Sequence, residues 1–85
     1  MPEGINLYIE RELAAGTLKL SAYKNSMFVG CLIGYHNHRA GTVKCFPYKN
    51  ILRGIFKDGD FPFFVRFDEL EWENRRSVMT EDRCR

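Results

Sequence analysis

The sequence predicts a mainly β (α+β) fold: a strongly bent five-stranded antiparallel sheet, or a small SH3/Sm-like barrel, with an N-terminal helix. With only 85 residues, the chain is too short to build two separate cores. Hydrophobic residues make up 45% of it and aromatic residues 14%, which is enough for one packed core. Short apolar segments alternate with polar residues between turn-forming residues, as in strands. A bent sheet of short strands tends to close, because closure removes exposed edges.

The domain organisation follows from the same composition. We expect residues 1–73 to form a single compact domain. Residues 74–85 are rich in charge and end in Arg83-Cys84-Arg85, so we expect a flexible C-terminal tail.

The first segment carries two periodicities. Ile5, Tyr8, Ile9 and Leu13 recur at helical spacing, and Gly16 would end such a helix as its C-cap. Ile5 also alternates with Leu7 and Ile9, as residues of a strand do. We favour the helix, because residues 10–15 have better helix than strand propensity.

The five strands are predicted over residues 17–22, 27–35, 42–46, 51–57 and 61–67. Residues 36–41 are expected to form a polar loop, and Pro47 to interrupt the third strand. Gly30 and Gly34 share one face of the second strand, where they would permit a bulge, a bend or close backbone contact.

The remaining signals concern turns. Asp58-Gly59-Asp60 predicts a hairpin. Pro62 lacks a donor, so the last strand should begin there or lie at a sheet edge. Its apolar face is expected to comprise Phe61, Phe63, Val65 and Phe67. Asp68 is expected to cap a short helical turn, with Glu71 completing a capping box.

One stretch loosely resembles the two Sm sequence motifs. It consists of Phe28-x-Gly30-x-Leu32-x-Gly34-Tyr35, followed later by Leu52-Arg53-Gly54. The chain departs from the motifs at His36, where that family has Asp, and at Ala40 and Gly41. We therefore assign no family on this pattern.

Location is inferred from apolar runs and cysteines. The longest apolar run, from Met27 to Tyr35, is too short to span a bilayer, and residues 1–4 show no secretory signal. The three cysteines are an odd number and follow no disulfide-scaffold spacing. We therefore expect reduced cysteines and a cytoplasmic location.

The cysteines and histidines raise two chemical alternatives, a zinc site and a Cys–His nucleophile. Cys31, His36, His38 and Cys45 provide a ligand set that Zn²⁺ accepts, but their spacing matches no short zinc-binding pattern. We favour core cysteines and loop histidines, and expect no metal or other cofactor. Cys45 with His36 or His38 would be a possible nucleophile–base pair, but no third orienting group or oxyanion motif accompanies it. No phosphate loop or nucleophile elbow occurs either, so we expect no enzymatic activity.

Charge is distributed unevenly along the chain. The net charge is +2, yet residues 13–57 contain no Asp or Glu and seven Lys or Arg. Aromatic residues are interleaved with these cations, and the acidic residues lie toward both ends. Cations neutralise phosphates and exposed rings stack on unpaired bases, so the central region is expected to contact nucleic acid.

The sequence therefore predicts a small non-enzymatic binding protein for RNA or single-stranded DNA. The expected contact residues are Lys24, Tyr35, His36, His38, Arg39, Lys44, Tyr48, Lys49 and Arg53. The alternative is a protein-binding inhibitor or adaptor of phage or plasmid type, which would block a larger protein or nucleoprotein target. Its partner would be an acidic protein surface, and Trp72, Arg75 and Arg76 would be candidate anchors. A homo-oligomer remains open, because small domains are marginally stable.

Overall fold

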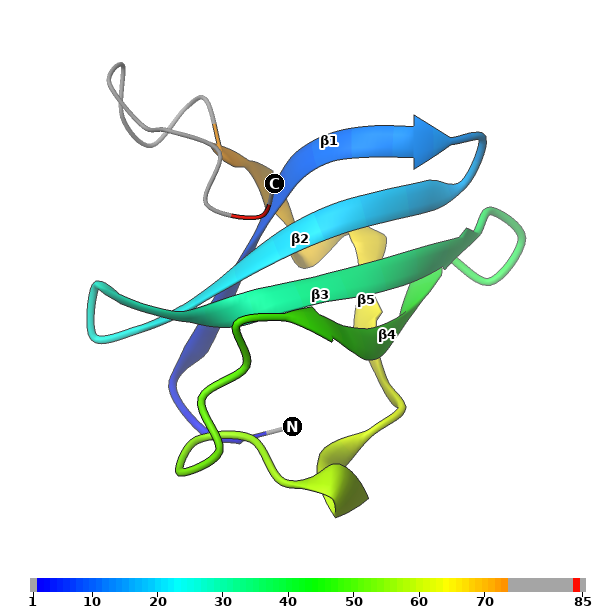
Figure 1. The fold of residues 1–85 in the computed structure, drawn as a ribbon. Helices are drawn as coiled ribbons and strands as arrows, with labels where there is room; N and C mark the ends of the chain where they lie inside the picture. The colour runs from blue at the N-terminus through cyan, green and yellow to red at the C-terminus, as the bar shows by residue number, and fades with distance from the viewer. Residues whose placement is uncertain (1, 74–83, 85) are drawn as a thin grey trace.

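The computed structural model describes residues 2–73 and residue 84, which form a single curled sheet (Figure 1). Its strands are β1 (Ile5–Ala14), β2 (Thr17–Lys24), β3 (Met27–Asn37), β4 (Thr42–Lys49), β5 (Phe63–Arg66) and β6 (Glu71–Trp72). The order across the sheet is β5-β4-β3-β2-β1-β6. β6 runs parallel to β1, and the other neighbours are antiparallel. The mainly β class is confirmed. The sheet is a mixed, six-stranded half-barrel, so the prediction of five antiparallel strands is wrong.

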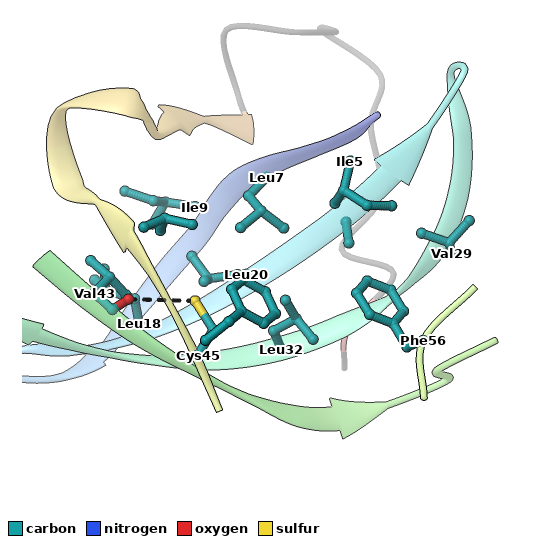
Figure 2. Close-up of a cluster of buried hydrophobic side chains, with 13 residues drawn as sticks. Ile5, Leu7, Ile9, Leu18, Leu20, Val29, Leu32, Val43, Cys45 and Phe56 are labelled. Atoms are coloured by element: carbon teal, nitrogen blue, oxygen red, sulfur yellow. Dashed lines mark hydrogen bonds between the residues drawn. The ribbon is translucent and has the colours of Figure 1, made fainter. Parts of the chain in front are cut away.

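The core lies on the concave, inner face of the sheet, as Figure 2 shows. Leu20 of β2, Leu32 of β3 and Val43 of β4 are fully buried there. Phe56, in the segment between β4 and β5, adds its ring to the same cluster. One curled sheet and one covering segment therefore suffice to enclose a core in a chain this short.

The predicted N-terminal helix is wrong, because residues 5–14 form β1. Ile5, Leu7 and Ile9 are all buried on the inner face, so the two-residue period decides the conformation of this segment. Gly16, with φ of +77°, belongs to the tight turn between β1 and β2 and caps no helix. Pairing along all of β2 outweighs the local helix propensity of residues 10–15.

The predicted strand over residues 51–57 is also wrong. The backbone N–H groups of Ile55 and Phe56 both donate to the Leu52 carbonyl, at 3.0 and 2.9 Å, so this segment turns. The Leu52 N–H donates to the Val29 carbonyl (3.0 Å), which holds the segment against the start of β3. Asp58–Asp60 forms the 3-10 helix η1 instead of a hairpin loop.

The β3–β4 hairpin is longer than expected. β3 continues to Asn37, so His36 lies in a strand and the predicted loop over residues 36–41 is too long. β4 continues through Pro47 to Lys49, with a register shift opposite Cys31 and Leu32. β5 pairs only with Thr42–Cys45, so β4 has a free edge at Pro47 and tolerates the missing donor.

The last of the five predicted strands corresponds to β5 and agrees with its sequence pattern. β5 is an edge strand that begins directly after Pro62, and Phe63 and Val65 are buried as predicted. The helical turn after it is η2 (Phe67–Glu69). The expected capping box is wrong, because Arg66 is the N-cap and makes no side-chain cap bond. The Asp68 carboxylate instead pairs with the Arg66 guanidinium, at 2.9 Å.

Cys31 and Cys84 form a disulfide, and Cys45 is a buried free thiol. The expectation of reduced cysteines is therefore wrong for two of the three. The cytoplasmic location stays a prediction, and the disulfide weighs against it because such bonds persist mainly in oxidising compartments. Apart from Cys84, the predicted tail lies outside the described residues. Within those residues, no helix has the length and apolar character that crossing a membrane requires.

Candidate functional site

The outer face of β3, β4 and β5 carries a row of exposed side chains. Tyr35 of β3 pairs with Lys44 of β4, and Lys44 pairs with Phe64 of β5, so the three lie side by side across the strands. Tyr35 is 49% exposed and Phe64 is 61% exposed. Large apolar side chains on a sheet face are usually covered, so this row is a candidate binding surface.

Phe46 extends the row along β4. Its ring packs edge-on against that of Tyr35, with centroids 5.5 Å apart. The Lys44 ammonium lies 5.4 Å from the centroid of Phe46 and 5.9 Å from that of Phe64, within range of cation–π attraction. We call Tyr35, Lys44, Phe46 and Phe64 the outer platform. It offers one cation flanked by three aromatic rings.

Strand alternation explains why these residues share a face. Val43 and Cys45 point into the core, so Lys44 and Phe46 between and after them must point outward. In β5, Phe63 and Val65 are buried and turn Phe64 outward in the same way. The inner core therefore determines the geometry of the outer platform.

A second group of predicted residues lies at the end of β3. The His36 ring stacks on Phe67 with centroids 4.0 Å apart and planes at 9°, and His38 lies 4.0 Å from His36 on a centroid basis. The Asn37 side-chain oxygen accepts the N–H groups of Arg39 and Ala40, both at 3.1 Å, and so shapes the turn. A cavity of about 640 Å³ opens here; it is lined by His36, His38, Ala40, Gly41, Thr42, Arg66, Phe67 and Asp68.

The surroundings of His36 change its protonation. Desolvation lowers the pKa of His36, and the nearby charge of His38 lowers it further, while Glu12 acts in the opposite direction. A histidine whose pKa is lower in the folded than in the unfolded chain favours folding in its neutral form. Its effect is therefore to destabilise the fold as pH falls from the ordinary value of 6.5 through the lowered pKa.

We expect His38→Gln to raise the pKa of His36, because the substitution removes the neighbouring positive charge. The rise should be partial, since desolvation is the larger cause and remains. The measurement is an NMR titration of the His36 ring protons. Arg39→Gln is the control, because it removes a charge from the same turn without removing the stacked imidazole. Equal His36 pKa values in His38→Gln and wild type would contradict the assigned coupling.

The other predicted residues lie elsewhere. Tyr48 and Lys49 end β4, with the Lys49 ammonium 5.0 Å from the Tyr48 ring centroid. Tyr48 and Arg53 line a second cavity, of about 350 Å³. Lys24 is the last residue of β2 and pairs with Met27 at the start of β3, whereas His36 lies near the other end of β3. The nine predicted residues thus occupy several places, and only Tyr35 and Lys44 meet on the outer platform.

The sequence analysis missed Phe46 and Phe64 as site residues. A signal for Phe64 was present, because the pattern that assigns Phe63 and Val65 to the inner face assigns Phe64 to the outer one. Phe67 was expected only in the apolar face of the last strand. Its stacking on His36 brings together residues 31 positions apart, which no local pattern reveals.

The cysteine chemistry is now defined for the described residues. Burial raises the pKa of the Cys45 thiol to about 12, so it stays protonated at neutral pH and lacks the thiolate that a Cys–His nucleophile needs. The Cys31 sulfur is bonded to Cys84 and provides no thiolate for zinc. Among residues 2–73 and 84, no group of three or more His, Cys, Asp or Glu is placed to hold a metal ion. The absence of enzymatic activity stays a prediction.

Comparisons with protein-family models, with curated proteins and with solved structures find no match to this chain. The candidate site therefore depends on the geometry alone.

Proposed function

We propose that this protein binds single-stranded nucleic acid, RNA or DNA, on the outer platform. One observation carries the proposal. The exposed rings of Tyr35 and Phe64 lie on either side of Lys44 in directly paired positions of three adjacent strands.

The physical basis is stacking combined with charge. An aromatic side chain contributes about 1–3 kcal/mol for each base that stacks on it, largely without regard to sequence. Tyr35 and Phe64 lie two strands apart, roughly 10 Å, so each can take a separate base. Lys44 between them is placed to meet the intervening phosphate. Bases in a duplex are already stacked on each other, so the platform favours unpaired strands.

The surrounding charge supports the same partner. No acidic residue occurs between Leu13 and Lys57, so β3 and β4 carry no negative charge, and β4 carries the cations Lys44 and Lys49. Lys49 and Tyr48 provide a further cation–ring pair at the end of β4. A nucleic-acid strand that continues from the outer platform along β4 would reach Lys49 about 17 Å from Lys44.

We expect Tyr35→Ala and Phe64→Ala each to weaken binding of single-stranded oligonucleotides by about tenfold, because each removes one stacking surface. Lys44→Ala should weaken binding of all sequences and reduce the slope of log K against log salt by about 0.7. The measurement is fluorescence anisotropy with labelled single-stranded and duplex RNA and DNA at two salt concentrations.

Two controls match these variants. Leu13→Ala removes an exposed apolar side chain from β1, and Lys24→Ala removes a lysine remote from the outer platform. Both should bind nearly as wild type does. If no oligonucleotide binds at low salt, the proposal is wrong. A pull-down for a protein partner would then test the inhibitor or adaptor hypothesis, in which Tyr35 and Phe64 would be interface anchors. Homo-oligomer formation stays a prediction.

A further inference from the structure

The second cavity lies between the end of β4 and the segment that joins β4 to β5. Its volume of about 350 Å³ falls within the range of about 300–1,000 Å³ that is typical of small-molecule sites. Its lining includes three aromatic residues, Tyr48, Phe56 and Phe61, and two cations, Arg53 and Lys57. Apolar walls with a few well-placed polar groups are typical of such sites. The cavity is therefore suited to a planar, negatively charged ligand.

A β-bulge places Tyr48 at this cavity. Pro47 of β4 pairs with Leu32 of β3. Lys49 pairs with the next residue of β3, Cys31, so Tyr48 is an extra residue in the ladder. Bulges redirect side chains and are common next to active sites. The Tyr48 ring accordingly lines the cavity and is 43% exposed.

Lys49 connects the cavity with the outer platform. Its partner Cys31 lies two positions from Ile33, the partner of Phe46, so the two partners share one face of β3. Lys49 therefore lies on the same outer face as Phe46. Its ammonium is 5.0 Å from the centroid of the Tyr48 ring. A nucleic-acid strand that reaches Lys49 from the outer platform is thus next to the cavity.

The walls that come from the joining segment are held in place by internal contacts. The Lys57 N–H donates to the Asp60 carboxylate (2.8 Å), and the Phe61 N–H donates to the Asp58 carbonyl (3.3 Å). The Phe61 ring lies 5.5 Å from the ring of Phe56, which is buried in the core (Figure 2). The cavity is therefore formed before a ligand arrives, which lowers the entropic cost of binding.

We propose that the second cavity takes one nucleotide of the strand bound on the outer platform, with its base against the aromatic walls and its phosphate on Arg53 and Lys57. This inference rests on the proposed function. A guanidinium can bind a phosphate through two N–H groups, and an ammonium binds it as a point charge. Asp58 also lines the cavity, but the two cations outweigh its charge. Its carboxylate can accept a hydrogen bond from the amino group of adenine.

The experiment is an NMR titration of the backbone amides with adenosine 5′-monophosphate (AMP), with adenosine and with inorganic phosphate. AMP should cause saturable shifts at Tyr48, Arg53, Lys57 and Phe61. It should bind about tenfold or more tightly than adenosine or phosphate, because only AMP meets both the aromatic walls and the cations. Equal affinity for AMP and phosphate would overturn the proposal, as would shifts that do not saturate.

Two variants test the two parts of the site. Arg53→Gln should weaken AMP binding about tenfold and leave adenosine binding unchanged, because it removes a charged contact to the phosphate. Tyr48→Ala should weaken binding of both compounds about tenfold, because it removes a surface for the base. Arg39→Gln is the matched control for Arg53→Gln, because Arg39 is also exposed but lies in the β3–β4 turn, outside the cavity. It should bind AMP as wild type does.

Anisotropy titrations with a single strand of about 16 nucleotides separate the two proposals. If Arg53→Gln weakens binding of this strand more than Arg39→Gln does, the nucleotide site is supported. If Tyr35→Ala weakens binding but AMP leaves the Tyr48 and Arg53 amides unshifted, the nucleotide site is refuted and the outer platform stands. If no oligonucleotide binds, the proposed function is wrong and the inference fails with it.

Discussion

Cys84→Ser is expected to lower the free energy of unfolding by about 4 kcal/mol, because it releases a long loop in the unfolded chain. The disulfide joins residues 53 positions apart, and in the chain-entropy account the effect grows with the logarithm of loop length. For a domain this small, the loss is a large share of a total of about 5–15 kcal/mol. The measurement is urea unfolding of wild type and variant without reductant, monitored by the fluorescence of Trp72.

Cys45→Ala is the control for removal of a cysteine. Cys45 is buried and has no disulfide partner, so its substitution should cost about 1 kcal/mol, the typical value for a point mutation. Alkylation of the unfolded, unreduced wild type should label Cys45 alone, and prior reduction should expose all three thiols. Three labelled thiols without reductant, or a loss below about 1 kcal/mol in Cys84→Ser, would contradict the assigned disulfide.

The fold could be predicted where local pattern and tertiary packing agree. β2, β3 and β5 were located because their apolar residues alternate and turn residues bound them. Residues 5–14 carry both a helical and an alternating pattern, and only the partner strand β2 decides between them. Residues 51–57 are apolar enough for a strand. The segment turns instead, and the Leu52 N–H bond to the Val29 carbonyl holds it against β3. In both segments the conformation depends on contacts with another part of the chain, so the local sequence pattern does not determine it.

The site could be predicted less well, because charge along a chain does not show which face a side chain occupies. Tyr35 and His36 are neighbours in sequence, yet Tyr35 belongs to the outer platform and His36 stacks on Phe67. The alternation of a strand separates them. Neighbouring residues of a strand therefore belong to different surfaces, even where the charge along the chain suggests one.

The disulfide could not be predicted from the sequence. An odd number of cysteines leaves open which one is unpaired, and connectivity does not follow from spacing. Cys31 lies in an apolar strand, which is where a free thiol is also expected. Its partner Cys84 is 53 positions away in the sequence, so only the tertiary structure brings the two sulfurs together.

Gly30→Ala is expected to lower the free energy of unfolding by about 3 kcal/mol, through steric overlap and backbone strain. Gly30 has φ of +148°, which residues with a side chain rarely adopt. A Cβ at this position would lie 2.7 Å from Ile51 Cδ1, 3.0 Å from Ile51 Cα and 3.1 Å from the Asn50 carbonyl oxygen. The last two are backbone atoms, so no rotation of a side chain relieves the overlap. The measurement is again urea unfolding.

Gly54→Ala is the matched control, because a Cβ there would meet no atom within 4 Å. It should leave stability unchanged or raise it slightly, by restricting the unfolded chain. The comparison tests how the half-barrel is completed, because the contact of residues 50–52 with β3 holds the segment that carries Phe56 into the core. Equal stability of Gly30→Ala and Gly54→Ala would mean that this segment does not pack on β3. The inner face would then lack the cover that Phe56 provides, and the outer platform would lose part of the core that orients Lys44 and Phe46.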